Sequence, residues 1–97
     1  MPWFHPTVRS STTEIVPHEL LPHHQRRIDA LADILVTLRH AKRLTTKQVA
    51  ARLGKPEAFV LDYESGKYRL DLPELVDISD ALGIDMVELV NLYQQRI

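Results

Sequence analysis

A chain of 97 residues is long enough for one compact domain and too short for a second. Its 44% hydrophobic and 26% charged residues are typical of a globular protein and exclude a disordered or fibrous one. It contains no cysteine, which excludes disulfides, thiolate zinc sites and a cysteine nucleophile. No apolar run approaches the length of a membrane span and the N-terminus lacks a signal-peptide pattern, so we expect a cytoplasmic protein with no membrane partner.

The formal net charge of −1 conceals a strong separation of charge along the chain. Residues 23–55 contain eight lysines and arginines against two acids, whereas residues 56–97 contain nine acids against three lysines and arginines. Such asymmetry often marks a face that binds an anionic partner, and nucleic acid is the usual candidate. The alternative is that these charges lie on solvated helix faces and bind nothing.

The first 22 residues predict an irregular N-terminal arm, because four prolines interrupt any regular helix there. The arm carries Trp3 and Phe4, two large apolar side chains that a free terminus would expose to water. We expect them to pack either on the body of the same chain or on a second subunit, which makes them candidate dimer contacts. Residues 23–97 then form the folded domain.

Helical periodicity begins directly after Pro22. Apolar residues recur at steps of three and four at Ile28, Leu31, Leu35 and Leu38. This spacing predicts one long helix that continues to about Leu44. A second, short helix begins at Thr45 or Thr46, either of which can cap it, and ends at Gly54.

Three further helices are predicted between glycines and prolines. Pro56 suits the first position of a third helix, which ends at Gly66. Residues 67–72 form an irregular connection, a fourth helix follows and ends at Gly83, and Asp85 caps a fifth. The apolar residues of these helices are Phe59, Val60, Tyr63, Leu75, Ile78, Ala81, Leu82, Val87, Leu89, Val90 and Tyr93. Because no stretch shows sustained period-two alternation, the predicted fold is all-α.

The second and third helices, residues 45–64, are short and are joined by a tight turn at Gly54, Lys55 and Pro56. This geometry lets the later helix lie in the major groove of DNA while the earlier one braces it across the backbone. The segment from Leu38 to Leu89 resembles the lambda-repressor/Cro-type (XRE) helix-turn-helix family, which implies a five-helix lambda-repressor-like domain. The resemblance is carried by Leu38-Arg39, Leu44-Thr45, Val49-Ala50, Leu53-Gly54, "YESGK" at 63–67, "RLDLPEL" at 69–75 and "DALGID" at 80–85.

The resemblance implies structural and phosphate-binding roles around this unit. In the family an arginine matching Arg39 pairs with a glutamate matching Glu64, which ties the first helix to the end of the third. A residue matching Thr46 contacts DNA phosphate at the N-terminus of the second helix, where free N–H groups and the helix dipole favour an anion. The further phosphate candidates are Lys42, Arg43, Lys47, Lys55 and Lys67.

Base reading falls in this family to the start and the exposed face of the third helix. The corresponding residues here are Glu57, Ala58, Leu61 and Asp62. They depart from the glutamine, serine and lysine common there, and Thr46 replaces a common glutamine. A carboxylate can accept only from the cytosine amino group, and every phosphate repels it. Three explanations stay open: the acids read a cytosine-rich site, Leu61 belongs to a face that binds a protein, or Arg26, Arg27 and the arm bind DNA in another orientation.

The five histidines do not predict a metal site. His18, His23 and His24 are close in sequence, but no cysteine or well-spaced carboxylate completes a coordination shell. The sequence also lacks a glycine-rich phosphate loop and a nucleophile motif. We therefore expect no metal, no cofactor and no enzymatic activity.

The resemblance implies a twofold dimer, because two recognition helices about one helical turn apart read a palindrome. The fifth helix carries apolar residues on more than one face, and Val90 and Tyr93 are its candidate dimer contacts. We expect a dimeric, sequence-specific transcription regulator, with repression as the simplest consequence of promoter binding. The alternatives are a degenerate helix-turn-helix module that binds a protein through the third helix, and an antitoxin that represses its own promoter.

Overall fold

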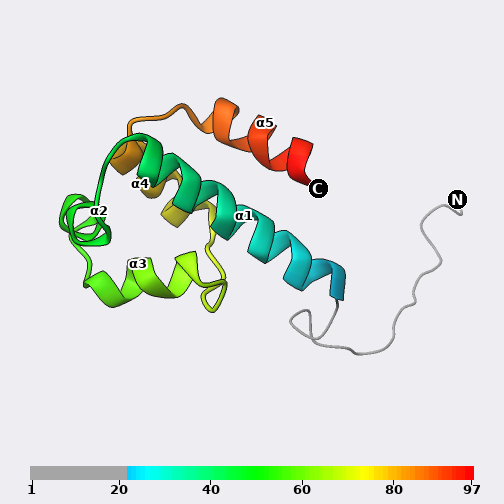
Figure 1. Ribbon diagram of the computed structural model, residues 1–97, viewed down its shortest axis with the longest axis horizontal. Helices are drawn as coiled ribbons and strands as arrows, with labels where there is room; N and C mark the ends of the chain where they lie inside the picture. Colours follow the sequence, from blue (N-terminus) through cyan, green and yellow to red (C-terminus); the bar gives the residue numbers. More distant parts are fainter. Residues whose placement is uncertain (1–21) are drawn as a thin grey trace, which may run out of the picture.

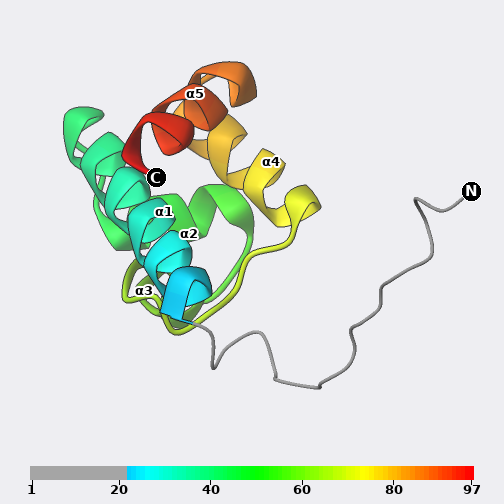
Figure 2. The ribbon, with the colours of Figure 1, turned by 90° about the vertical axis from the view of Figure 1, so that its right-hand side faces the viewer.

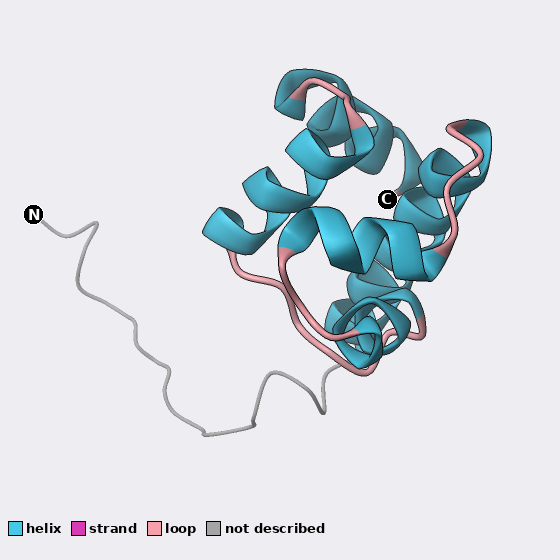
Figure 3. Ribbon diagram, turned by 90° about the vertical axis from the view of Figure 1, so that its left-hand side faces the viewer, coloured by secondary structure: helices cyan, strands magenta, loops and turns pink. Residues whose placement is uncertain are grey.

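The computed structural model describes residues 22–97, and these residues form five α-helices (Figure 1). The helices are α1 (Pro22–Ala41), α2 (Thr46–Leu53), α3 (Glu57–Glu64), α4 (Leu72–Leu82) and α5 (Met86–Arg96). Within this range there is no strand, which confirms the predicted all-α fold (Figure 3). The predicted arm, with Trp3 and Phe4, lies outside the described residues except for Pro22, which begins α1.

The first helix is shorter than its apolar pattern predicts. It ends at Ala41, whereas the prediction extended it to about Leu44. Arg43 adopts the left-handed conformation with φ 58°, and the N–H of Leu44 turns back to donate to the carbonyl of Arg39 at 3.1 Å. Such a turn satisfies carbonyls at the end of a helix and stops the helix from continuing. The apolar Leu44 therefore packs on the core from a turn rather than from α1.

The turn between α2 and α3 is built as the sequence indicates. Gly54 takes φ 67°, a left-handed conformation that costs glycine little, and it ends α2. The N–H of Lys55 then donates to the carbonyl of Ala50 at 3.0 Å. Pro56 precedes α3 as its N-cap rather than forming its first helical residue, so the predicted start was one residue early. These contacts hold the two helices at a sharp angle.

Asp71 starts α4 earlier than the sequence analysis placed it. Its side chain accepts from the N–H of Glu74 at 2.8 Å, and the Glu74 side chain accepts from the N–H of Asp71 at 2.9 Å. This reciprocal capping box makes Leu72 the first helical residue, although the prediction left residue 72 in the connection. At α5 the predicted cap is confirmed, because Asp85 accepts from the N–H of Val87.

The core lies where all five helices meet. Its most completely buried side chains are Leu35, Val49, Val60, Ile78, Leu82 and Leu89. Figure 2 shows α1 and α4 on opposite sides of the domain, with α5 above and α3 below. The helix α1 packs against α3 and α5, while α2 packs against α3 and α4. In this arrangement the outer faces of α2 and α3 are left exposed at one end of the molecule.

Candidate nucleic-acid interface

The N-terminus of α2 has a reciprocal capping box. The Thr45 hydroxyl accepts from the N–H of Gln48 at 3.1 Å, and the Gln48 side chain accepts from the N–H of Thr45 at 2.8 Å. The first turn of a helix offers no intrahelical acceptors to its leading N–H groups, so those of Thr46 and Lys47 point outward. With the positive end of the helix dipole, these groups favour an anion such as a phosphate.

A short hydrogen bond joins the start of α2 to the start of α3. The hydroxyl of Thr46 donates to Oε2 of Glu57 at 2.6 Å, and both residues are half-buried. The sequence predicts a phosphate contact for Thr46 and a base contact for Glu57, but it does not predict the hydrogen bond between the two side chains. Because a hydroxyl has one proton, Thr46 can reach a phosphate only through its backbone N–H while this bond is made.

The outer face of α3 is exposed along its whole length. Ala58, Leu61 and Asp62 lie at the helical spacing that places them on one face, and all three are exposed. Leu61 is 50% exposed, although α3 also supplies the buried residues Val60 and Tyr63. The structure therefore brings three of the four base-reading candidates together on one surface, with Glu57 at its N-terminal edge.

Three of the candidate phosphate-binding cations border the α2–α3 unit. Lys47 is exposed in the first turn of α2, and Lys67 is exposed directly after α3, where its N–H donates to the carbonyl of Asp62 at 3.0 Å. Lys55 precedes α3, and its ammonium lies 5.2 Å from the centre of the Phe59 ring. A cation over an aromatic face is held in place without being neutralised. The three lysines therefore flank the acidic helix.

The two cations of the α1–α2 turn are placed differently. The ammonium of Lys42 donates to the carbonyl of Gly83 at 3.5 Å, so it is directed toward the α4–α5 connection. Arg43 is exposed beside it in the left-handed turn residue. These cations lie at the end of α1 rather than along α3, and only a ligand that extends past α2 would meet them.

Arg39 and Glu64 form a bidentate pair between α1 and the end of α3. The Nε of Arg39 donates to Oε2 of Glu64 at 2.6 Å, and Nη2 donates to Oε1 at 3.0 Å. The two side chains are only 12% and 10% exposed, and the hydrogen bonds that Arg39 donates to Glu64 raise the pKa of Arg39. The remaining Nη1 donates to the carbonyl of Leu44 at 2.9 Å. One guanidinium thus connects α1, the α1–α2 turn and α3.

Arg52 has a structural role that the sequence analysis did not assign. Its guanidinium donates to the carbonyl of Ala81 at 2.7 Å and so satisfies a carbonyl in the last turn of α4. Cations near a helix C-terminus are favoured by the exposed carbonyls and by the dipole. One of the eight cations of residues 23–55 is therefore engaged in holding α2 against α4.

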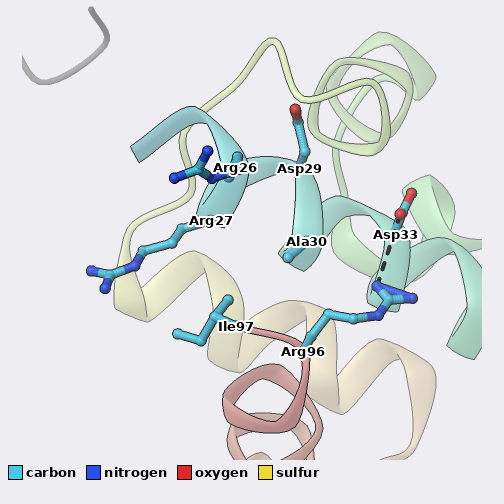
Figure 4. A pocket seen from close by; sticks show the side chains of 7 residues that line it. All are labelled: Arg26, Arg27, Asp29, Ala30, Asp33, Arg96 and Ile97. Atoms are coloured by element: carbon cyan, nitrogen blue, oxygen red, sulfur yellow. Dashed lines mark ion pairs between the residues drawn. The ribbon is translucent and has the colours of Figure 1, made fainter. Parts of the chain in front are cut away.

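A hollow at the start of α1 is lined by three further arginines (Figure 4). Arg26, Arg27 and Arg96 line it together with Asp29 and Asp33. Arg96 lies 3.8 Å from Asp33 in an exposed ion pair. The two carboxylates offset much of the positive charge, so this hollow is a less favourable phosphate site than the first turn of α2.

The described residues contain neither a metal-binding cluster nor a membrane-spanning helix. Between residues 22 and 97, no group of three histidine or acidic side chains is arranged to hold a metal ion. Over the same residues, none of the helices has the length and apolar character needed to cross a membrane.

Comparison with known proteins supports this interpretation of the fold. Residues 28–92 match the model of the family described as helix-turn-helix domain. An XRE-family-like protein from Pseudomonas syringae pv. tomato is 37% identical, with a TM-score of 0.70, and the match covers 75% of this chain and 89% of that one. No curated protein sequence gives a significant match.

Two restriction-modification controller proteins share the fold. C.AhdI from Aeromonas hydrophila is 27% identical with a TM-score of 0.61, over 64% of this chain and 94% of that one. C.Esp1396I, solved as a tetramer with its natural 35 base-pair operator, is 14% identical with a TM-score of 0.68, over 72% of this chain and 92% of that one.

The two short helices, the tight turn between them and the exposed face of the second define a helix-turn-helix protein. The chain belongs to the helix-turn-helix domain family and is of the XRE type, which confirms the resemblance seen in the sequence.

Proposed function

We propose that this protein is a sequence-specific DNA-binding transcription regulator that acts as a homodimer and represses a promoter by occupying it. The observation that carries the proposal is the exposed face of α3, which stands directly beside the open N-terminus of α2. A recognition helix and a phosphate site must be adjacent in this way, because the bases and the backbone of one groove are adjacent in DNA.

In the proposed complex α3 enters the major groove while α2 holds the backbone. The N–H groups of Thr46 and Lys47 bind a phosphate, and Lys55 and Lys67 bind phosphates at either end of α3. Glu57 accepts from the Thr46 hydroxyl through Oε2, and among residues 22–97 no side chain or N–H group donates to Oε1. Oε1 can accept a hydrogen bond from the amino group of a cytosine.

The acids on α3 set the balance between affinity and selectivity. Carboxylates gain nothing from phosphates, so the affinity of this surface for arbitrary DNA comes from the surrounding cations alone. A cytosine opposite Glu57 offsets the desolvation of the carboxylate, whereas other bases leave that carboxylate without a donor. The surface is therefore suited to selective binding of moderate affinity.

Dimerisation is supported by the exposed face of α5. Val87 and Val90 lie on its outer side and are exposed, while Tyr93 is half-buried against the core. C.Esp1396I is described as an oligomer on its operator, and twofold assembly is the common way in which such domains read two half-sites. We propose that Val90, with Tyr93 at its edge, contacts a second copy.

One observation favours a second candidate function. Leu61 exposes half of its surface at the centre of the outer face of α3, between Ala58 and Asp62. An apolar side chain framed by acids fits a protein surface with an apolar pocket and basic rim better than it fits a phosphate backbone. In that case the domain binds a protein partner through α3.

The experiment that tests the proposed function is a selection of bound sequences from random duplex DNA by the full chain. The selected duplex is then titrated at two salt concentrations. Enrichment of a palindrome whose affinity falls as salt rises supports the proposal. No enrichment by a folded protein contradicts it and favours the protein-binding candidate.

Two matched variants locate the DNA on the domain. Lys47→Ala and Arg26→Ala remove the same charge from exposed positions on α2 and at the start of α1. The proposal expects Lys47→Ala to weaken binding to all sequences and to flatten its salt dependence, with little change for Arg26→Ala. The reverse result would show that DNA binds in the alternative orientation, along Arg26, Arg27 and the arm.

A further inference from the structure

An apolar groove runs beside the first half of α1, and of its lining residues only Tyr93 takes part in the proposed function. It has a volume of about 370 Å³ and lies between α1, the end of α3, the connection before α4, and α5. Its apolar lining includes Ile28, Leu31 and Leu70, and the cation Arg27 stands in its wall. An apolar channel with a cation in its wall suits a segment that combines apolar side chains with acids.

Tyr63 indicates a second property that an occupant of the groove should have. This residue lines the groove and is 2% exposed, yet no hydrogen bond joins its hydroxyl to any of residues 22–97. Buried hydroxyls nearly always have a hydrogen-bond partner, because leaving one without a partner is unfavourable. An occupant that brings a carbonyl or carboxylate oxygen would supply the acceptor.

We propose that residues 14–21 of the same chain occupy this groove. Their sequence contains both kinds of side chain that the groove requires. Ile15, Val16, Leu20 and Leu21 are apolar, and Glu14 and Glu19 are the only acids of the first 22 residues. The apolar residues match the lining formed by α1, and the carboxylates match the cation in the wall.

The length and attachment of this segment also fit. The groove lies along α1 from His24 to Leu35, which corresponds to about 17 Å of helix. Eight residues in an extended conformation span up to about 26–29 Å, so the segment can follow the groove to its far end. The segment is joined to α1 at Pro22, next to the mouth of the groove. This covalent tether gives it an effective concentration that no free ligand reaches easily.

The test uses the full chain and its lack of native cysteine. A nitroxide on Thr13→Cys places one spin label at the start of the segment, and the intensity loss of each backbone amide is read from NMR spectra. Docking predicts severalfold loss at Leu31 and Leu70, which line the groove, and no loss at Leu53, which does not. Uniform loss, or loss nowhere, overturns the proposal.

Two variants confined to the contact add specificity. Leu20→Asp should abolish the loss at Leu70 without altering the helical content, because it changes the segment and not the domain. Glu19→Arg and Arg27→Glu should each reduce the intensity loss at the groove, and the double variant should restore that loss. If the intensity loss in the double variant is no greater than in the single variants, the proposed charge pairing is contradicted.

A mixing experiment shows whether the segment docks on its own chain or on a second copy. Spin-labelled protein without isotope is mixed with isotope-labelled protein that carries no nitroxide. Docking within one chain predicts no intensity loss at Leu31 and Leu70 in the mixture. Loss in the mixture would show that the segment enters the groove of a second copy, and it would overturn the intramolecular assignment.

Discussion

Thr46 and Glu57 are eleven residues apart in the chain, yet a 2.6 Å hydrogen bond joins the first residue of α2 to the first residue of α3. One of these side chains stands at the proposed phosphate site and the other at the proposed base-reading edge. The bond fixes the Glu57 carboxylate in one orientation before DNA arrives. A carboxylate held in this way loses little freedom on binding, which favours selectivity.

Thr46→Val should weaken base selection without unfolding the protein. Valine has nearly the shape of threonine but cannot donate, so the Glu57 carboxylate loses its partner. We expect the preference at the base pair facing Glu57 to fall by about 1–3 kcal/mol, while the affinity for random DNA is nearly unchanged. Competition titrations with single-base variants of the selected duplex measure this difference.

Glu57→Gln and a distant threonine complete this experiment. Glu57→Gln should change which base is preferred, and combining it with Thr46→Val should give less than the sum of the two effects. Thr37→Val makes the same change at an exposed position on α1 and should leave selection intact. Strictly additive effects would show that the Thr46–Glu57 hydrogen bond does not couple these two residues in base selection.

Arg39→Ala should destabilise the domain strongly. The substitution leaves the nearly buried Glu64 carboxylate and the Leu44 carbonyl without their shared donor. Removing one partner of a buried ion pair costs about 3–5 kcal/mol. The free energy of unfolding, measured with urea, gives the loss.

Arg96→Ala is the matched control for that measurement. It also removes an arginine from an ion pair, but the Arg96 and Asp33 side chains are 44% and 74% exposed and 3.8 Å apart. An exposed pair contributes about 1 kcal/mol or less. If the two variants lose equal free energy of unfolding, burial does not increase the contribution of the Arg39–Glu64 pair to stability.

Much of this architecture is predictable because it depends on local sequence. The step of three and four between Ile28 and Leu38 gives α1, and Gly54 and Gly83 end helices at left-handed positions. The errors are also local. The end of α1 was placed too late because Leu44 continues the apolar pattern while Arg43 leaves the helix.

The contacts of the candidate site were harder to predict because they depend on tertiary packing. Nothing in the spacing of Arg52 indicates that it donates to a carbonyl 29 residues later. The Thr46–Glu57 bond likewise exists only because the turn at Gly54 brings two helix starts together. Periodicity identifies which faces are apolar, but it does not identify the partner of a polar side chain.

The Tyr68–Glu74 contact predicts a pH effect at the start of α4. The hydrogen bond from the Tyr68 hydroxyl at 2.6 Å, with a second from the N–H of Asp71, lowers the pKa of the Glu74 carboxyl. Because the folded-state pKa is depressed, this group stabilises the fold above its unfolded pKa of about 4.3. That contribution is lost as the pH falls through the lower folded-state value.

Tyr68→Phe tests the cause of this shift. Without the hydroxyl, the pKa of Glu74 should rise toward its ordinary value, as followed by the side-chain carboxyl signal in an NMR titration. Tyr93→Phe removes a hydroxyl from α5, which makes no contact with Glu74, and should leave the titration unchanged. An unchanged pKa in Tyr68→Phe would assign the shift to the backbone N–H of Asp71 instead.

Leu61→Lys separates the two candidate functions, because it has opposite consequences for them. A lysine on the outer face of α3 adds a possible phosphate contact, so DNA binding should tighten and its salt dependence should steepen by about one contact. The same lysine in an apolar protein interface would abolish binding to the partner. DNA titrations at several salt concentrations and partner capture measure the two effects.

A second exposed leucine controls for nonspecific charge. Leu72→Lys adds the same cation at a position that is 65% exposed at the start of α4 rather than on the outer face of α3. It should steepen the salt dependence of DNA binding less than Leu61→Lys does. Equal effects would mean that DNA responds to net charge rather than to the surface of α3.

Val90→Asp should convert the dimer to a monomer if α5 forms the proposed interface. Val90 is 40% exposed on α5, so the carboxylate is tolerated in the single domain but is buried without a partner at a dimer contact. Val76→Asp makes the same change at a residue that is 39% exposed on α4, which lies outside that interface. Sedimentation equilibrium over a range of concentrations should show weakened association for Val90→Asp alone. Because two linked domains bind a palindrome more tightly than one, Val90→Asp should also lower the affinity for DNA. If Val76→Asp weakens association instead, the dimer interface lies on α4.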